Sequence, residues 1–294
     1  MTANAPIPLK AIPSARDRLE SRILVWTVVP LLFIAAAEPA VQTVSLGDPI
    51  RPLLLALLFS LAFAAIVWLL RSATAGAAAV GFLICMVLAQ SPTRLNGNSM
   101  LQVKEVSALI TLYLLTFAAT RFGRARKEAR GLAEARTGRR ASQVIANLGI
   151  SALCAALDPH FTLTSGTACI AALAEATADT LSSEIGQAIG GPAFLITTLR
   201  RVPPGTDGAI SLPGTLAGLL GAAVVICVGI QGAANVHILA FAAATLGLFF
   251  DSLLGATLER RGWVGNDLVN FSSTAFGAAI SLIAMRVLST NPSL

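Results

Sequence analysis

Acidic side chains occupy an unusual place in this chain, because they stand within segments that are otherwise apolar. The stretch AEATADTLSSEIGQAIG at residues 174–190 carries Glu175, Asp179 and Glu184, and Asp251 stands in a second apolar stretch. An ionised group at bilayer depth is costly, so such residues usually face a protein interior, a water-filled cavity or an ion. These carboxylates are therefore the first candidates for a functional site.

Three roles are compatible with carboxylates at this depth. They can form structural ion pairs, with the arginine pairs at 139–140, 200–201 and 260–261 as partners. They can line a transport pathway for protons, cations or an anionic solute, in which intramembrane Asp and Glu are common. They can also hold Mg²⁺ at the membrane boundary, while arginines, hydroxyls and glycine backbone hold phosphates for phosphoryl transfer.

The segment LITTLRRVPPGTDGAISLPGT at residues 195–215 favours phosphoryl transfer among these roles. Beside its paired arginines it carries hydroxyl side chains, and glycines whose bare backbone N–H groups can approach an anion. These residues are Thr197, Thr198, Thr206, Ser211 and Thr215, with Gly205, Gly208 and Gly214. A solvated loop between helices would explain the glycines and prolines, but not so many hydroxyls beside arginines.

A second polar segment, GNDLVN at residues 265–270, begins the last apolar stretch. Asn266 and Asp267 suit helix N-caps as well as a binding site, whereas Asn270 falls inside the predicted helix and favours a binding site. The sequence contains no GK[ST] phosphate loop, no kinase HRD or DFG signature and no GxSxG elbow. Any nucleotide chemistry must therefore use a membrane-embedded site of another kind.

The composition predicts that membrane-spanning helices carry these residues. Hydrophobic residues make up 55% of the 294 and charged residues 12%, whereas a soluble domain has about a quarter charged. Crossing a bilayer takes roughly 20 apolar residues. The runs of this kind are 24–44, 50–70, 73–90, 104–120, 142–158, 166–184, 211–231, 235–256 and 268–288. We therefore predict an all-α fold, a polytopic transmembrane helical bundle with about nine spans.

The basic residues indicate the orientation of this bundle. Most of the 21 Lys and Arg residues fall on one side when the N-terminus is placed in the cytoplasm, as the positive-inside rule requires. The net charge of +6 then reflects topology, so we expect the lipid bilayer and no nucleic acid as a partner. The cysteines have no CxxC spacing, which favours neither a zinc site nor a disulfide framework. We predict an integral protein of a bacterial inner membrane with its active site on the cytoplasmic face.

Three parts follow one another along the chain. Residues 1–22 form a cytoplasmic N-terminal leader, and residues 23–120 form a transmembrane scaffold of four spans with few polar groups. Residues 121–294 form a core with a cytoplasmic basic loop, five spans and the candidate active site. By this topology, the loops 121–143, 185–210 and 257–268 all open on one face of the membrane.

Several motifs together resemble one known family. They are GRRASQVIAN (138–147), ATADTLSSEIG (176–186), the segment 195–215, DSLLGATLERR (251–261) and NDLVN (266–270). The pattern resembles a widespread family of integral membrane proteins, long catalogued as being of unknown function, that includes plant phytyl-phosphate kinase. The resemblance implies conversion of a prenyl monophosphate, of phytyl or geranylgeranyl type, to the diphosphate. It further implies a nucleoside triphosphate, CTP or ATP, as co-substrate and Mg²⁺ as cofactor.

The resemblance also implies roles for individual residues. Asp179, Glu184 and Asp251 would be the catalytic carboxylates and metal ligands, with Glu175 as a supporting group outside the family pattern. Arg139 and Arg140 would neutralise phosphates, with Arg124 and Lys127 as lesser candidates. The residues that would bind nucleotide or line the pocket are Gln143, Asn147, Thr197, Thr198, Gly205, Thr206, Ser211, Gly214, Thr215, Asn266, Asp267 and Asn270.

Two rival functions use the same residues. A proton- or ion-coupled transporter, or a lipid translocator, would use the carboxylates as a pathway, and a clear inverted repeat would favour it. The first four spans lack counterparts of the polar motifs, so the sequence shows no such repeat. A non-catalytic membrane scaffold is the other alternative, in which Asp179→Ala would affect folding or assembly without a separate chemical defect.

Overall fold

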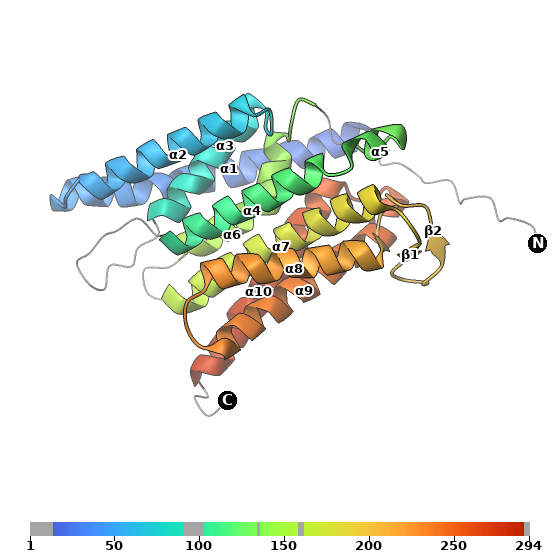
Figure 1. The fold of residues 1–294 in the computed structure, drawn as a ribbon. Helices are drawn as coiled ribbons and strands as arrows, with labels where there is room; N and C mark the ends of the chain where they lie inside the picture. The colour runs from blue at the N-terminus through green and yellow to red at the C-terminus, as the bar shows by residue number, and fades with distance from the viewer. Residues whose placement is uncertain (1–13, 91–102, 134–135, 158–161, 291–294) are drawn as a thin grey trace, which may run out of the picture.

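The fold is known from a computed structural model that describes residues 14–90, 103–133, 136–157 and 162–290. The described residues form ten α-helices, most of which run side by side in one bundle (Figure 1). They are α1 (Ser14–Leu46), α2 (Arg51–Leu69), α3 (Ala75–Gln90), α4 (Val103–Arg121), α5 (Arg124–Ala129), α6 (Ala141–Ala156), α7 (Thr162–Ile189), α8 (Leu212–Gly229), α9 (Ala234–Thr257) and α10 (Asn266–Thr290). The predicted all-α class is confirmed. Each predicted apolar run corresponds to one helix, and the short α5 lies in the basic loop.

Five of the described helices are long and apolar enough to cross a bilayer, namely α1, α2, α8, α9 and α10. The apolar helices α3 and α6 have 16 residues each, and at 1.5 Å per residue they are about 24 Å long, shorter than a hydrocarbon core of about 30 Å. α7 is longer, but carboxylates and hydroxyls lower its hydropathy. The protein is a polytopic helical membrane protein, with fewer full-length apolar spans than the roughly nine predicted from 20-residue runs.

The central helix of the bundle is α7. It contacts α4, α6, α8, α9 and α10, and its residues 168–174 are all buried. Small residues let α8 approach it closely, because a Cβ at Gly218 would collide with Ser182 Oγ and with the backbone oxygen of Ala178. The helix that carries Glu175 and Asp179 is therefore surrounded by protein along this stretch.

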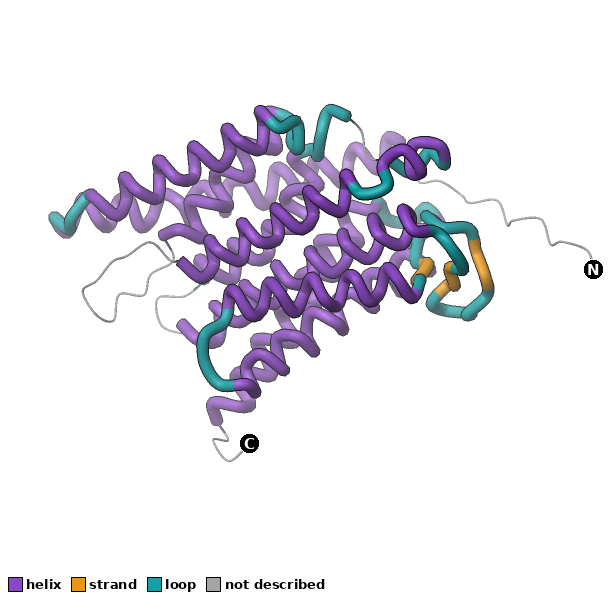
Figure 2. Tube along the Cα trace, viewed as in Figure 1, coloured by secondary structure: helices purple, strands orange, loops and turns teal. Residues whose placement is uncertain are grey.

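The loop before α8 folds into a small antiparallel sheet, which the sequence analysis did not predict. β1 (Ala193–Leu195) lies between β2 (Arg201–Val202) and β3 (Ala209–Ile210) (Figure 2). Strands of two or three residues are too short to show a period-two pattern. Gly205 and Gly208 have φ of +84° and +70°, a backbone conformation that glycine adopts without steric cost, and they turn the chain between β2 and β3.

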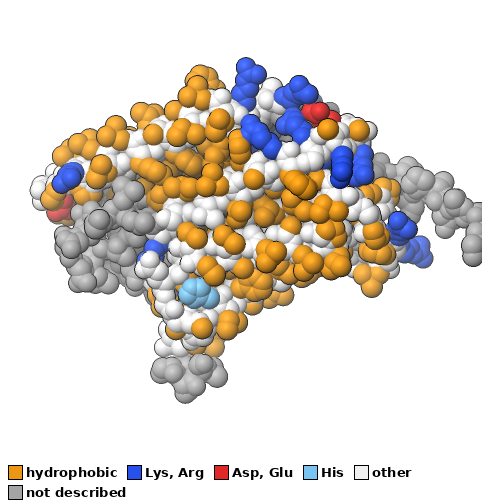
Figure 3. Space-filling model, in the orientation of Figure 1, with side chains coloured by type: hydrophobic (Ala, Val, Ile, Leu, Met, Phe, Trp, Pro, Cys, Tyr) orange, Lys and Arg blue, Asp and Glu red, His pale blue; other side chains and the backbone are white. Residues whose placement is uncertain are grey.

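Hydrophobic and basic side chains occupy different parts of the surface. Hydrophobic side chains cover much of the visible face of the bundle, and most of the visible Lys and Arg lie near α5 and the small sheet (Figure 3). We call this end of the bundle, with residues 121–133, 136–140, 190–211 and 257–266, the polar end. Apolar residues elsewhere, such as Trp26 and Leu212, are largely exposed, as expected of side chains that face lipid.

Candidate functional site

Two of the predicted carboxylates face one cavity at the polar end. Asp179 of α7 and Asp251 of α9 both line a cavity of about 170 Å³, which we call the acidic cavity. Residues 204–211 of the loop before α8 form another part of its wall. Ser273 of α10 donates a hydrogen bond of 3.1 Å to Asp251 Oδ2. This bond fixes the Asp251 carboxylate at the cavity.

Glu175 lies one helical turn before Asp179 and is buried among α7, α9 and α10. Its exposed fraction is 1%, and neither carboxylate oxygen meets hydrogen-bond criteria with a described residue. A Cβ at Gly247 would lie 2.6 Å from Glu175 Cγ, so this glycine makes room for the side chain. A bound cation would stabilise the ionised forms of carboxylates buried in this region.

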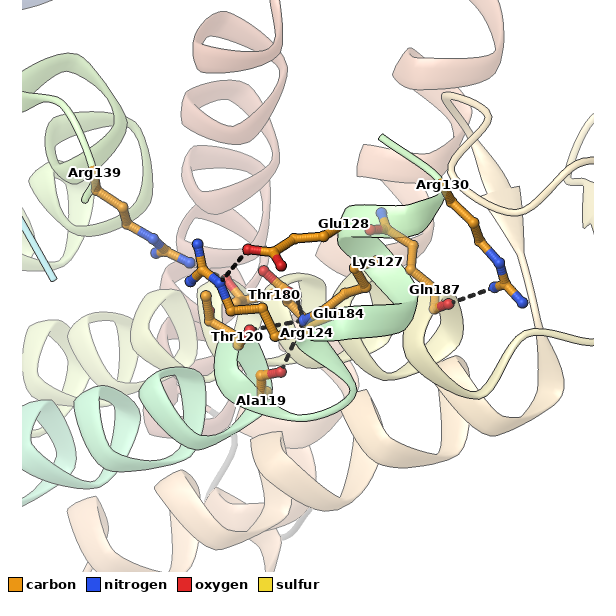
Figure 4. A network of polar contacts seen from close by, with 10 residues as sticks. All are labelled: Ala119, Thr120, Arg124, Lys127, Glu128, Arg130, Arg139, Thr180, Glu184 and Gln187. Carbon is orange, nitrogen blue, oxygen red and sulfur yellow. Dashed lines mark hydrogen bonds and ion pairs between the residues drawn. The ribbon is translucent and has the colours of Figure 1, made fainter. Parts of the chain in front are cut away.

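Glu184 does not join these carboxylates. It forms a buried ion pair with Lys127 of α5, whose Nζ also donates to the backbone oxygens of Ala119 (3.2 Å) and Thr120 (2.8 Å) (Figure 4). Convergence with Asp179 required α7 to bend or end near Gly186, but the helix continues to Ile189. In the part of the chain that the structure describes, no three acidic, His or Cys side chains form a complete metal site.

The predicted phosphate-binding loop contributes part of its residues to the acidic cavity. Gly205, Thr206, Ser211 and Thr215 line it. Ser211 also caps α8, since its Oγ accepts a 3.3 Å hydrogen bond from the backbone N–H of Gly214. The loop therefore presents hydroxyls and positive-φ glycine backbone opposite Asp179 and Asp251.

Three other residues predicted in this loop lie elsewhere. Thr197 and Thr198 are exposed between β1 and β2 and do not line the cavity. Gly214 is buried against α7, where a Cβ would collide with the backbone oxygen of Ser182. Gly214 thus allows α8 to pack closely on α7 and has no direct access to the cavity.

The sequence analysis missed two acidic residues at the acidic cavity. Asp207 and Glu259 both line it, and Asp207 belongs to the quoted segment 195–215. Burial raises the pKa of Asp207, and the positive charge of Arg260 opposes this effect. Glu259 lies within the motif at residues 251–261, which was the available signal, whereas Asp207 lies in a loop where carboxylates are usually solvated.

Arg139 connects the basic loop to α7. Its backbone pairs with the turn after α2, where Arg139 N donates to Ser72 O at 2.9 Å and Arg139 O accepts from Thr74 N at 3.0 Å. Its guanidinium lies 3.5 Å from Thr180 Oγ1 of α7, and both residues are drawn in Figure 4. Arg139, which was predicted to bind phosphate, therefore contacts α7 at the residue after Asp179.

Arg140 and Asp267 make structural contacts next to this site. Asp267 is buried, accepts a 2.8 Å hydrogen bond from Ser21 Oγ, and lies 3.9 Å from Arg140 Nη2. Glu20 Oε2 accepts a 2.7 Å hydrogen bond from the backbone N–H of Gly265. The predicted leader 1–22 is thus partly helical, because α1 begins at Ser14 and its first turns bind the start of α10.

The predicted amides form a second contact between α6 and α10. Gln143 Oε1 accepts a 2.7 Å hydrogen bond from the backbone N–H of Arg140 and caps α6. Asn147 Nδ2 donates to Gln143 O at 2.8 Å, and Asn270 Nδ2 lies 3.5 Å from Asn147 Oδ1. Asn266 lines the acidic cavity. These side chains therefore flank the site from two helices, with Asn266 in contact with the cavity itself.

Comparisons with known proteins agree with the motifs. The family model described as "Integral membrane protein DUF92" matches residues 58–278, well over half of the chain. An uncharacterised membrane protein of Synechocystis sp. is 35% identical over 184 residues, which cover 59% of this chain and 71% of that protein. "Protein VTE6, chloroplastic" of Arabidopsis thaliana is 33% identical over 195 residues, covering 61% and 58%. An uncharacterised membrane protein of Methanocaldococcus jannaschii is 35% identical over 182 residues, covering 61% and 76%. No solved structure gives a significant match.

Proposed function

The chain belongs to the DUF92 family of integral membrane proteins, and from that premise we propose that it phosphorylates a prenyl monophosphate to the diphosphate. The resemblance of its motifs to a family that includes plant phytyl-phosphate kinase supports this substrate class. The observation that carries the proposal is the acidic cavity, where Asp179 and Asp251 face a loop of glycines and hydroxyls. That combination of groups suits a nucleoside triphosphate with its metal ion.

Mg²⁺ fits the residues of the acidic cavity. This ion is usually bound through one or two carboxylates together with phosphate oxygens, so it does not need a complete protein cage. Asp179 and Asp251 would hold it, since both line the cavity. When bound, Mg²⁺ neutralises charge on the donor phosphates.

The proposed reaction needs positioning and charge neutralisation more than proton transfer. An oxygen of the ionised prenyl monophosphate forms a bond to the terminal phosphorus of CTP or ATP. The bond from that phosphorus to its bridging oxygen breaks, and the nucleoside diphosphate leaves. Arg139 lies beside Thr180, the residue after Asp179, so it is placed to neutralise the phosphoryl group in transfer.

Glu184 has a different role in this proposal from the one its motif implies. Its buried ion pair with Lys127 holds α5 against α7, and the same lysine binds two backbone oxygens at the end of α4. We therefore assign Glu184 to positioning the basic loop, and Asp179 and Asp251 to the metal.

The test uses purified protein in detergent with phytyl and geranylgeranyl monophosphates, Mg²⁺ and each of the four nucleoside triphosphates. Mass spectrometry follows the prenyl diphosphate, and Asp179→Asn is compared with Asp48→Asn. Asp48 is an exposed aspartate outside the acidic cavity, so it controls for the substitution itself. We expect product from wild-type protein, product from Asp48→Asn, and a loss of about 100-fold or more for Asp179→Asn.

Two results would contradict the proposal. The first is no diphosphate with any pairing from protein shown to be folded, which would favour an ion or lipid pathway through the same carboxylates. The second is full activity in Asp179→Asn, which would remove the acidic cavity from the reaction. Thermal unfolding of both variants shows whether a lost activity reflects a lost fold.

A further inference from the structure

A second and larger cavity lies beside Arg139, among α2, α3, α4 and α6. Its volume is about 580 Å³, within the range of roughly 300–1,000 Å³ that is usual for small-molecule sites. Apolar side chains such as Phe63, Val67, Leu112 and Leu148 form most of its wall. We call it the apolar cavity. Its helices belong mostly to the segment 23–120, which the sequence suggested was only scaffold.

Basic side chains line the part of the apolar cavity that lies nearest the polar end of the bundle. Its rim contains Arg71, Arg121, Arg124, Arg136 and Arg139, and Glu128 is the acidic residue among the described lining. Glu128 accepts 3.1 Å hydrogen bonds from both Arg124 and Arg136, and these contacts lower its pKa. Positive charge therefore exceeds negative charge at the rim. A cavity with apolar walls and a basic rim matches an apolar chain that ends in an anion.

The backbone fixes one arginine of this rim in place. Gly138 has φ of +82°, and a Cβ there would lie 2.5 Å from the backbone N of Ala73. This close approach lets Arg139 pair with Ser72 and Thr74 at the start of the cavity. Backbone hydrogen bonds through its N–H and its carbonyl oxygen therefore hold Arg139 in place, and the residue lines the apolar cavity.

We propose that the apolar cavity holds the prenyl chain of the monophosphate acceptor, with its phosphate among the rim arginines. This inference rests on the proposed kinase function and names its acceptor site. Arg139 lines the apolar cavity and lies 3.5 Å from Thr180, the residue after Asp179. An acceptor phosphate bound by Arg139 would therefore lie near the α7 segment that carries Asp179, a residue of the acidic cavity where the nucleotide phosphates are proposed to bind.

The structure offers a position in the cavity wall at which a larger side chain starts without a clash at its Cβ. Gly81 of α3 lines the cavity, and a Cβ at this position meets no atom within 4 Å. It lies six residues beyond Ala75, which at 1.5 Å per residue is about 9 Å from the polar end of α3. Gly81→Leu would fill the deep part of the cavity and leave the arginine rim unchanged. The variant should then bind short prenyl chains but exclude the longer chains that the wild-type cavity holds.

Gly76 of the same helix supplies a matched control. It is exposed, does not line the cavity, and a Cβ there also meets no atom within 4 Å. Gly76→Leu gains the same side chain in the same helix, so effects of helix propensity are shared by the two variants. A difference in prenyl-phosphate binding between the two variants therefore reports the effect of filling the cavity.

The experiment measures equilibrium binding of radiolabelled geranyl (C10) and geranylgeranyl (C20) monophosphates without nucleotide, and then turnover of each with nucleotide and Mg²⁺. Gly81→Leu should weaken C20 binding by about tenfold or more and leave C10 binding nearly unchanged. Gly76→Leu should match wild type for both. Unlabelled phosphatidic acid, a two-chain phosphate lipid, should compete poorly.

Each other outcome has a definite meaning. Equal C20 binding by wild type, Gly81→Leu and Gly76→Leu overturns the cavity assignment, even if all three are active kinases. Strong competition by phosphatidic acid assigns the cavity to bilayer phospholipid and also overturns it. The expected binding pattern without turnover would support the acceptor-chain site and contradict the kinase function, so the two failures are distinguishable.

Discussion

The buried ion pair between Lys127 and Glu184 provides the sharpest test of how the site is organised. The side chains are 1% and 11% exposed, and Lys127 also donates to the backbone oxygens of Ala119 and Thr120. Removing one partner of such a pair leaves an uncompensated buried charge, which costs about 3–5 kcal/mol. Lys127→Met or Glu184→Leu alone should therefore destabilise the protein strongly.

The double variant separates the structural role from a metal role. A well-packed apolar pair often replaces a buried ion pair at little cost, so Lys127→Met/Glu184→Leu should recover most of the lost stability. Each single variant should lower the midpoint of thermal unfolding in detergent by roughly 10 °C. Glu128→Gln is the control, because its pairs with Arg124 and Arg136 are exposed to solvent and exposed ion pairs contribute little to stability.

Activity of the double variant decides the assignment of Glu184. If Glu184 only positions the basic loop, the double variant should keep kinase activity and an unchanged Mg²⁺ requirement. A stable double variant that has lost its activity, or that needs much more Mg²⁺, would refute this reasoning. It would return Glu184 to the metal site that its sequence motif implied.

Three further predictions concern neighbouring residues. Gly138→Ala should lower activity and stability together, because the new Cβ would strain a positive φ and displace Arg139 from the turn after α2; unfolding and turnover assays check this, with the exposed glycine in Gly76→Ala as the control. Ser273→Ala should raise the Mg²⁺ concentration for half-maximal activity by about tenfold or more, because Ser273 orients Asp251. Ser272→Ala, which removes a hydroxyl that donates to Leu268 O of its own helix, should leave this concentration unchanged. The raised pKa of Asp207 means that the Asp207 carboxyl group holds its proton more tightly in the folded state than in the unfolded chain. The contribution of Asp207 to stability therefore falls as pH rises from its ordinary pKa of 3.8 through its raised pKa. Asp207→Asn should remove this pH dependence in unfolding scans between about pH 4 and 8.

The helices were predictable from the sequence because each apolar segment forms its backbone hydrogen bonds within itself. The bilayer core offers no water to hydrogen-bond the backbone N–H and C=O groups of an apolar run. Runs such as 211–231 and 235–256 therefore form helices. The position of Asp179 and Asp251 inside these helices also indicated a protein interior. In the structure both side chains line one cavity.

The remaining features depend on contacts between distant segments. The pairing of Glu184 with Lys127 joins residues 57 positions apart, and local spacing on α7 gave no sign of it. The small sheet has strands too short for a pattern. The apolar cavity requires α2, α3, α4 and α6 to leave a space lined by Gly81 and Leu112, and the apolar character of each helix looks the same whether it faces lipid, protein or a ligand.

The most direct measurement of the central claim is transfer of the terminal phosphate of γ-labelled CTP or ATP to geranylgeranyl monophosphate by purified protein. The account predicts labelled geranylgeranyl diphosphate that requires Mg²⁺ and disappears in Asp179→Asn. Folded protein that transfers no label to prenyl monophosphate, with either nucleotide and with phytyl monophosphate as the alternative acceptor, would contradict it.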